Sequence, residues 1–190
     1  FTGRNIMKEV LFGERIKLCR PICNSETAEA IYTVINKCKE AFIPWLGWGT
    51  NYRKEDALSF LETADIDWNN NSQFVYAIYL ENTFIGLVSV LNVAWQHKRA
   101  EIGYWLDTNY TGNGYMTEAV NMIEKELFDN GFNRIVIYTD VLNVKSAKIP
   151  QTLGYKLEGI LRQDIYSEPN KRFRDRNVFS KLKSEYNVKK

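Results

Sequence analysis

The chain has 190 residues, of which 45% are hydrophobic and 25% are charged. This balance is typical of a globular protein with a sizeable core, and it excludes a disordered, fibrous or low-complexity chain. The 25 basic and 23 acidic residues leave a net charge of only +2, which argues against a dedicated nucleic-acid-binding protein. We therefore expect one domain over residues 1–190.

The first part of the chain predicts a strand, two helices and an aromatic loop. Residues 15–20 alternate apolar and polar side chains, which indicates a strand. Apolar residues at helical spacing predict a helix that begins near residue 25 and continues to about residue 38. The segment 42–50 is broken by proline and glycine and is typical of a loop, and a second helix is expected from residue 53 to about 68.

Three strands and a helix are expected next. Residues 74–80 and 84–91 predict a hairpin, and residues 99–106 predict a third strand that contains Gly103, a residue type that often marks a bulge. A helical pattern then ends at Gly131. The remaining expected elements are a strand at 134–139, a short helix at 146–153, and strands at 155–161 and 173–182.

The resulting order is β-α-α-β-β-β-α-β-α-β-β, which is neither strict alternation nor separate blocks of helices and strands. It predicts an α/β fold with a mixed sheet and helices on both faces. The strands in the unit from residue 101 to 139 should be parallel and joined by a right-handed crossover.

Cysteine and histidine usage limits the chemistry. The chain has three cysteines and a single histidine, His97, which lies in a polar stretch. Sparse, odd-numbered cysteines without a preceding apolar signal segment predict reduced thiols and a cytoplasmic location. We expect no metal site and no Ser-His-Asp triad, because either would depend on His97. No apolar run approaches the roughly 18–20 residues of a membrane span.

Positive charge is concentrated near the end of the chain. Residues 171–190 contain eight Lys or Arg and two acidic residues. We interpret this bias as a solvated segment, and the alternative is a site for an acidic partner or a phosphate group.

The most informative segment is Thr111-Gly112-Asn113-Gly114-Tyr115-Met116-Thr117, which leaves a strand and opens a helix. Two glycines allow a tight turn that presents successive N–H groups, and such a turn at a helix N-terminus favours phosphate. The alternative is a plain connector without a ligand. A P-loop is excluded because the chain has no Gly-Lys pair, and the dinucleotide fingerprint would need glycine at position 117.

This segment resembles the acetyl-CoA site of the GNAT N-acetyltransferases. The family pattern Gln/Arg-x-x-Gly-x-Gly/Ala is similar to Asn109-Tyr110-Thr111-Gly112-Asn113-Gly114, with Asn109 at the position of Gln or Arg. Downstream, Asn143-Val144-Lys145-Ser146 and Leu153-Gly154-Tyr155 resemble the family's N-x-x-S and L-G-F segments. The resemblance spans about residues 15–182. Within the family, the chain looks like the branch of ribosomal-protein alanine and serine N-terminal acetyltransferases.

The resemblance implies a V-shaped sheet in which the strands at 101–106 and 134–139 part at one end. Gly103 is expected to carry the bulge that starts the separation. Acetyl-CoA would enter the gap, with its pantetheine arm along the first strand and its pyrophosphate on the turn. The cofactor-binding residues implied are Tyr104, Trp105, Leu106, Asn109, Thr111, Gly112, Asn113, Gly114, Tyr115, Met116, Thr117, Asn143 and Ser146.

The implied reaction is direct transfer of an acetyl group from a thioester to an amine in a ternary complex. An α-amine has a pKa near 7.7–8, whereas that of lysine is near 10.4, so a weak base suffices for a protein N-terminus. Glu101 is the candidate base, and an ordered water or a simple ion pair of Glu101 with Arg99 or Lys98 are the alternatives. Ser146 is the candidate acid, unless it only orders its turn. Tyr155 is expected to be a core aromatic.

Three tryptophans in apparent loops, Trp45, Trp48 and Trp95, are candidate walls of an acceptor pocket. The alternative is that they pack the helices on the sheet. The expected acceptor is a protein N-terminus, as in ribosomal-protein acetylation. Other readings are a small amine (a polyamine, an amino acid or an aminoglycoside) and an acyl-CoA-binding module without turnover. We expect no membrane and no direct nucleic-acid partner, and the exposed sheet edges permit a homodimer.

Overall fold

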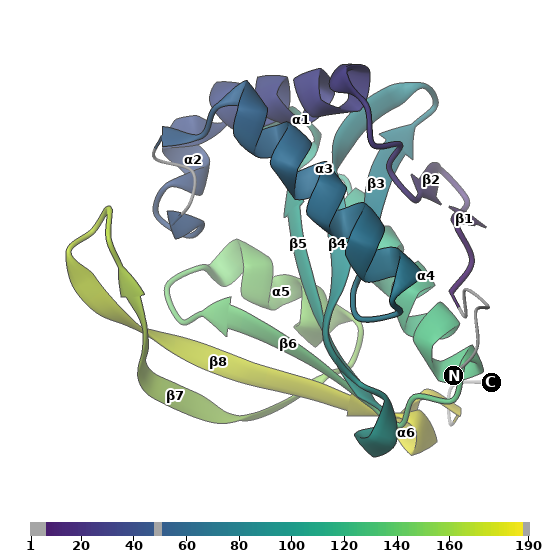
Figure 1. Ribbon diagram of the computed structural model, residues 1–190. Coiled ribbons are helices and arrows are strands. Elements are labelled where there is room, and N and C mark those ends of the chain that lie inside the picture. The colour runs from purple at the N-terminus through teal and green to yellow at the C-terminus, as the bar shows by residue number, and fades with distance from the viewer. Residues whose placement is uncertain (1–6, 48–50, 188–190) are drawn as a thin grey trace.

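The computed structural model describes residues 7–47 and 51–187, and one mixed sheet connects these parts of the chain. Its eight strands lie in the order β1-β2-β3-β4-β5-β6-β8-β7 (Figure 1). All neighbouring strands are antiparallel except β5 and β6, which are parallel. The strands are β1 (Val10–Phe12), β2 (Ile16–Cys19), β3 (Phe74–Leu80), β4 (Thr83–Ala94), β5 (Arg99–Leu106), β6 (Arg134–Asp140), β7 (Lys156–Ser167) and β8 (Arg172–Leu182).

Helices cover both faces of the sheet, as the sequence predicted. One core lies between the sheet and the pair α1 and α3, and the other lies between the sheet and α4 with α5. The helices are α1 (Ser25–Lys37), α2 (Lys39–Phe42), α3 (Lys54–Asn69), α4 (Tyr115–Asp129), α5 (Val144–Thr152) and α6 (Lys183–Asn187), with 3-10 turns η2 (Trp95–His97) and η3 (Thr108–Tyr110).

Local sequence explains where these helices begin. The Asn24 side chain accepts a hydrogen bond from the Thr27 N–H at 2.8 Å and so caps α1. Ala28, Ile31 and Ile35 then fall on one buried face of the helix. The predicted helix is therefore confirmed, and its capping residue is Asn24.

The parallel strands β5 and β6 separate after a short paired stretch. Only Arg99, Ala100 and Glu101 of β5 are paired with β6, at Arg134, Ile135 and Val136. Beyond this point β5 stays paired with β4 as far as Leu106, and β6 stays paired with β8 as far as Asp140. Each strand thus follows its antiparallel neighbour, and the sheet opens into the V that the sequence predicted (Figure 1).

The bulge near this opening is not where it was expected. Gly103 pairs in register with Ser89, whereas the register shift lies in β4 between Leu91 and Ala94. Asn92 occupies the shifted stretch with a φ of 49°, a left-handed conformation that asparagine tolerates better than most residues. The prediction that Gly103 carries the bulge was therefore wrong.

Some elements had no clear sequence signal. β1, α2 and α6 are three to five residues long, which is too short for a periodic pattern. β7 extends to Ser167, beyond the predicted end at 161, because most of this edge strand is exposed and needs no apolar alternation. Among the described residues, no helix has the length and apolar character needed to span a bilayer.

Candidate active site

The separation of β5 and β6 leaves the far half of β5 with an open backbone edge. Within residues 7–47 and 51–187, no strand pairs with this edge on the β6 side beyond Glu101. Because successive side chains of a strand alternate between faces, Tyr104 and Leu106 contact the α4 side whereas Trp105 contacts the α1 side. Glu101 lies on the same face as Trp105. The opening therefore offers main-chain groups to a ligand and different side chains on its two sides.

The glycine turn lies between the end of β5 and the start of α4. Gly112 and Gly114 have φ values of 84° and 80°, which favour glycine. Side-chain hydrogen bonds within the segment stabilise the turn. Thr111 Oγ1 donates to the Thr108 carbonyl at 2.9 Å. Asn113 Nδ2 lies 3.3 Å from the carbonyls of both Tyr110 and Thr111. The expected tight turn is present in full.

The first turn of α4 has backbone N–H groups with no intrahelical acceptor. Asn24 and Asn143 cap α1 and α5 with their side chains, but the N-cap of α4 is Gly114, which has none. A Cβ added at Gly112 would meet no heavy atom of the described residues within 4 Å. The turn therefore has both the open space and the donors that a phosphate group needs.

A buried carboxylate fixes the start of this turn. Asp107 is 2% exposed, accepts from the Asn109 N–H at 3.0 Å and caps η3. Lys37, at the end of α1, forms an ion pair with Asp107, and the hydrogen bond between the two side chains raises the pKa of Lys37. Cys38 Sγ lies 3.6 Å from the same carboxylate. Sequence reasoning missed this link, because the partners are about 70 residues apart.

Asn143 and Ser146 lie together at the start of α5. The Asn143 side chain accepts from the Ser146 N–H at 3.1 Å and so acts as the N-cap. Asn143 therefore has a structural role at the start of α5. Ser146 reaches the open end of the V because α5 directly follows β6.

Tyr104 bridges the opening to reach Ser146. Its hydroxyl donates to the Ser146 carbonyl at 3.0 Å, and Ser146 Oγ lies 3.5 Å from the same hydroxyl. The Ser146 carbonyl is available because its helical donor would be the N–H of residue 150, which is Pro150 and has none. A proline inside α5 therefore frees the acceptor that holds Tyr104.

Burial controls the protonation of Tyr104. Removal from water raises the pKa of Tyr104 to about 12, although the hydrogen bond with Ser146 opposes the shift. The hydroxyl therefore stays protonated across the neutral range and can donate a proton or a hydrogen bond.

Glu101 is positioned by a residue of the neighbouring strand. Its carboxylate accepts a hydrogen bond from Asn92 Nδ2 at 2.7 Å. Asn92 lies in the irregular stretch of β4, so the register shift brings its amide to Glu101. Its hydrogen-bond partner is thus an amide, in place of the ion pair with Arg99 or Lys98 that the sequence left open.

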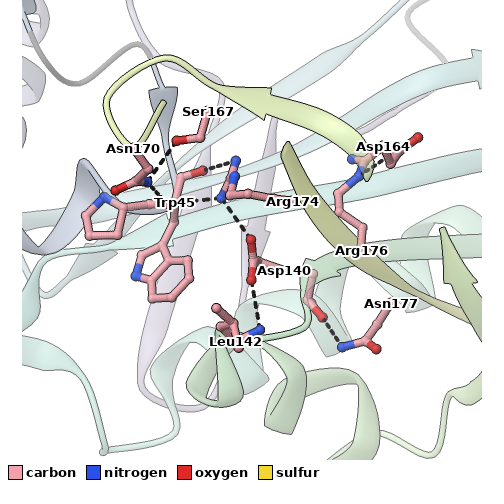
Figure 2. Close-up of polar contacts among 11 residues, drawn as sticks. Trp45, Asp140, Leu142, Asp164, Ser167, Asn170, Arg174, Arg176 and Asn177 are labelled. Carbon is pink, nitrogen blue, oxygen red and sulfur yellow. Dashed lines mark hydrogen bonds and ion pairs between the residues drawn. The ribbon is translucent and has the colours of Figure 1, made fainter. Parts of the chain in front are cut away.

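Trp45 lies where the α2 loop meets the β7–β8 hairpin (Figure 2). Arg174 of β8 donates to the carbonyls of Pro44 at 3.0 Å and Trp45 at 3.3 Å. The same guanidinium donates to Asp140 Oδ2 at 3.1 Å, at the end of β6. Both side chains are at least nine-tenths buried. Arg174 thus anchors the Trp45 loop to the strand that borders the opening, an anchor that the sequence did not predict.

A second arginine pair lies beside the first. Arg176 pairs with Asp164 of β7 and its guanidinium carbon lies 4.5 Å from the centroid of the Tyr138 ring. The carboxylates of Asp140 and Asp164 are therefore both neutralised on this side of the opening (Figure 2).

The other two tryptophans differ from Trp45. Trp95 lies next to the paired start of β5 and donates to the Asn71 carbonyl at 2.7 Å. Its ring packs against that of Phe132 at a tilt, with the ring centroids 4.8 Å apart. These contacts correspond to the alternative in which a tryptophan packs the helices on the sheet. Trp95 does not lie with Trp45, so we do not include Trp95 in the proposed acceptor pocket. Trp48 lies outside the described residues.

Two further sequence interpretations can be placed. Tyr155 is 6% exposed and belongs to the core, as expected. Burial and the nearby Glu124 carboxylate raise the pKa of Tyr155 well above the usual value.

Most of the described basic residues near the end of the chain form ion pairs with carboxylates: Lys171, Arg174, Arg176 and Lys181. These ion pairs argue against a phosphate site, but Arg174 and Lys181 are buried, so the expectation of a solvated segment is wrong for these two residues. The described residues contain no group of three His, Cys, Asp or Glu that could hold a metal.

Comparison with known proteins identifies the family and supports the fold. The family model described as "Acetyltransferase (GNAT) domain" matches residues 17–156. The Bacillus subtilis protein named "Putative ribosomal N-acetyltransferase YdaF" is 27% identical over 180 residues, 92% of this chain and 94% of its own. The Escherichia coli ribosomal-protein-serine acetyltransferase is 30% identical over 109 residues, 57% of this chain and 60% of its own.

A solved structure is similar over most of the chain. It is the microcin C7 self-immunity acetyltransferase MccE in complex with acetyl-CoA and AMP, with a TM-score of 0.83 and 33% sequence identity. The match covers 89% of this chain and 93% of that one.

Proposed function

Because the chain belongs to the GNAT acetyltransferase family and is an acetyl-CoA-dependent N-acetyltransferase, we propose that it acetylates the α-amine at a protein N-terminus. We treat residues 1–190 as one acetyltransferase domain, since all eight strands belong to one sheet. One observation supports our proposal that the reaction takes place at this opening. The strand β5 separates from β6 after Glu101 and leaves an open backbone edge between Glu101, the candidate base, and Ser146, the candidate acid.

The residues around the opening fit acetyl-CoA. The N–H groups from Gly112 to Tyr115 are proposed to hold its pyrophosphate, because this turn has open space and no side-chain cap. The free edge of β5 from Tyr104 to Leu106 is proposed to pair with the pantetheine arm. The remaining proposed contacts come from the same turn and from the start of α5: Asn109, Thr111, Met116, Thr117, Asn143 and Ser146.

Acetyl-CoA supplies a thioester-activated acetyl group, and the protein has to deprotonate an amine and protonate a thiolate. We assign the first task to Glu101, which lies on β5 and is oriented by Asn92. Since an α-amine has a pKa near 7.7–8, roughly a tenth is already neutral at pH 7 and the base has little to do. The attack is direct, within a ternary complex.

The second task falls to the pair formed by Tyr104 and Ser146. Their hydroxyl oxygens are 3.5 Å apart at the open end of the V, on the opposite face of β5 from Glu101. Base and acid on opposite faces suit a reaction in which the amine approaches from one side and the thiol departs on the other. An N–H near Tyr104 to Leu106 is the proposed donor to the developing oxyanion.

Charge supports an α-amine over a polycationic small molecule. A polyamine or aminoglycoside pocket needs free carboxylates, but Asp140 and Asp164 beside the Trp45 loop are both paired with arginine. The similarity to YdaF over nearly the whole chain supports an acceptor on the ribosome. Such an acceptor places the enzyme in the cytoplasm.

A second candidate acceptor is a small amine attached to an adenylate group. The observation that favours it is the AMP present with acetyl-CoA in the MccE structure, which is 33% identical to this chain.

The test is acetyl transfer to matched peptides, followed by mass spectrometry. One peptide has a free N-terminus and no lysine, and the other has a blocked N-terminus and an internal lysine. The proposal predicts acetylation of the first only. Acetylation of aminoacyl-adenylate analogues with neither peptide modified would favour the second candidate.

A further inference from the structure

The turn between β1 and β2 contacts the start of α4, far from it in sequence. The Gly13 N–H donates to the Ile16 carbonyl at 2.9 Å and closes this turn. A Cβ at Gly13 would lie 2.6 Å from Glu118 Oε1, so a larger residue there would displace the Glu118 carboxylate from its present position. Arg15 is carried on this turn and so reaches the glycine turn that precedes α4.

The Arg15 side chain contacts residues on both sides of Gly114. Nη1 donates to the Asn113 carbonyl at 2.8 Å, and Nε donates to Glu118 Oε2 at 2.8 Å. The guanidinium carbon lies 4.8 Å from the centroid of the Tyr115 ring. One rigid, planar group therefore spans the turn and the first turn of α4.

The contact with Asn113 also sets the direction of the next N–H group. The Asn113 carbonyl and the Gly114 N–H belong to one planar trans peptide, so they point in opposite directions. Because Arg15 holds the carbonyl on its own side, the Gly114 N–H is turned to the other side. Gly114 has no side chain and a φ of 80°, so without this contact the peptide could rotate more freely.

Arg15 also balances a charge that would oppose an anion. Glu118 lies in the first turn of α4, where its carboxylate would repel a phosphate group. Although burial raises the pKa of Glu118, the hydrogen bonds from the Arg15 N–H and side chain outweigh this and lower it, so the carboxylate is ionised at neutral pH. The guanidinium cancels that charge beside the turn.

We propose that Arg15 is a positioning residue of the cofactor site, which aims the Gly114 N–H and the first amides of α4 at the pyrophosphate of acetyl-CoA. This rests on the proposed placement of acetyl-CoA at Gly112–Tyr115, and it adds a residue about 100 positions upstream of that turn. The pyrophosphate, rather than the 3′-phosphate, is the group affected, because the contacts of Arg15 are to the turn itself.

The test is calorimetric titration of the full chain with acetyl-CoA and with acetyl-3′-dephospho-CoA, which keeps the pyrophosphate. For Arg15→Gln we expect the dissociation constants of both ligands to rise about tenfold. Arg15→Lys keeps the positive charge but not the planar guanidinium, so we expect both dissociation constants to rise about threefold. This variant replaces Arg15→Gln in the test if Arg15→Gln does not fold. Arg20→Gln is the matched control, since Arg20 pairs with Glu9 and Asp65 at the other end of β2.

The proposal is supported if the Arg15 variants bind both ligands more weakly by the same factor and Arg20→Gln binds them as tightly as the parent chain. Three results overturn it: unchanged affinity in the Arg15 variants, weakening of acetyl-CoA alone, or equal weakening in Arg20→Gln. Failure of the parent chain to bind acetyl-CoA overturns the placement of the cofactor as well. Binding without acetylation of any peptide N-terminus overturns only the proposed acceptor.

Discussion

The Tyr104 hydroxyl donates to the Ser146 carbonyl at 3.0 Å and so links β5 to the start of α5 beyond the point where β5 and β6 separate. The contact exists because Pro150 leaves that carbonyl without a helical donor. It also brings the Ser146 hydroxyl to within 3.5 Å of the Tyr104 hydroxyl. The two residues therefore form one unit at the site where a thiolate has to be protonated.

Tyr104→Phe is expected to lower kcat about 100-fold, because it removes the hydroxyl that completes this unit. Acetyl-CoA affinity, measured by calorimetry, should stay within about twofold, since the backbone of β5 is unchanged. The pKa of about 12 predicts that the loss in kcat is the same from pH 6 to pH 9. Tyr166→Phe, an exposed tyrosine on β7, is the control. An unchanged kcat would remove Tyr104 from the reaction.

Pro150→Ala should lower kcat about threefold to tenfold, because it supplies an N–H at position 150 that competes with Tyr104 for the Ser146 carbonyl. The double variant with Tyr104→Phe tests the mechanism. Since both changes act through one contact, the effect of Pro150→Ala should disappear in the Tyr104→Phe background. Additive losses in kcat would contradict the link between the proline and the tyrosine.

Glu101→Gln is expected to lower kcat/KM about tenfold at pH 6.5 for a peptide N-terminus. The loss should shrink above pH 8, where the α-amine is mostly neutral without a base. Asn92→Ala should cause a smaller loss with the same pH trend, because it removes only the group that orients Glu101. The measurement is a pH profile of kcat/KM, and a constant ratio to the parent chain would exclude Glu101 as the base.

Gly112→Ala should weaken acetyl-CoA binding about tenfold or more, because its Cβ points into the space proposed for phosphate. It should also cost about 1–2 kcal/mol of stability, since φ is 84°. Gly131→Ala is a close control at the other end of α4, with a φ of 87° and no atom of the described residues within 4 Å of an added Cβ. Equal affinities in the two variants would contradict the phosphate assignment.

Glu158→Gln is expected to reduce stability at pH 7 by no more than about 1 kcal/mol, because the Glu158 side chain is 41% exposed. Hydrogen bonds from Arg134 and Ser180 lower the pKa of Glu158 from 4.5 to about 2. A lowered pKa stabilises the folded state above the unfolded value, and that contribution is lost as the pH falls from 4.5 to about 2. Urea unfolding at pH 7 and pH 3 should therefore give a smaller difference at pH 3, and a constant difference would contradict the assignment.

The sequence predicted the features that depend on local pattern. The strand at residues 99–106 and the glycine turn were both recognisable because each depends on neighbouring residues. The V-shaped opening was also expected, and it is confirmed by the short pairing of β5 with β6.

The remaining features depend on long-range contacts. The pairing of Lys37 with Asp107, of Arg174 with Asp140, and of Arg15 with Glu118 joins residues that lie far apart in the chain. The bulge predicted at Gly103 was misplaced because a register shift depends on the partner strand. The sequence left open whether Trp95 lines the acceptor pocket or packs the helices, because a loop sequence does not show which end of the V it borders. Pro150 can be read from the sequence, and it leaves the Ser146 carbonyl without a helical donor. The sequence does not show that Tyr104 donates to this carbonyl instead.

The central claim is that acetyl-CoA binds where β5 leaves β6, on the turn before α4. Its most direct test is calorimetric titration of the chain with acetyl-CoA, with NAD as a second phosphate-bearing ligand and Gly112→Ala as the site variant. We predict micromolar binding of acetyl-CoA, no binding of NAD and a loss of affinity in Gly112→Ala. Equal binding of acetyl-CoA by the parent chain and Gly112→Ala, or no binding by either, would contradict the account.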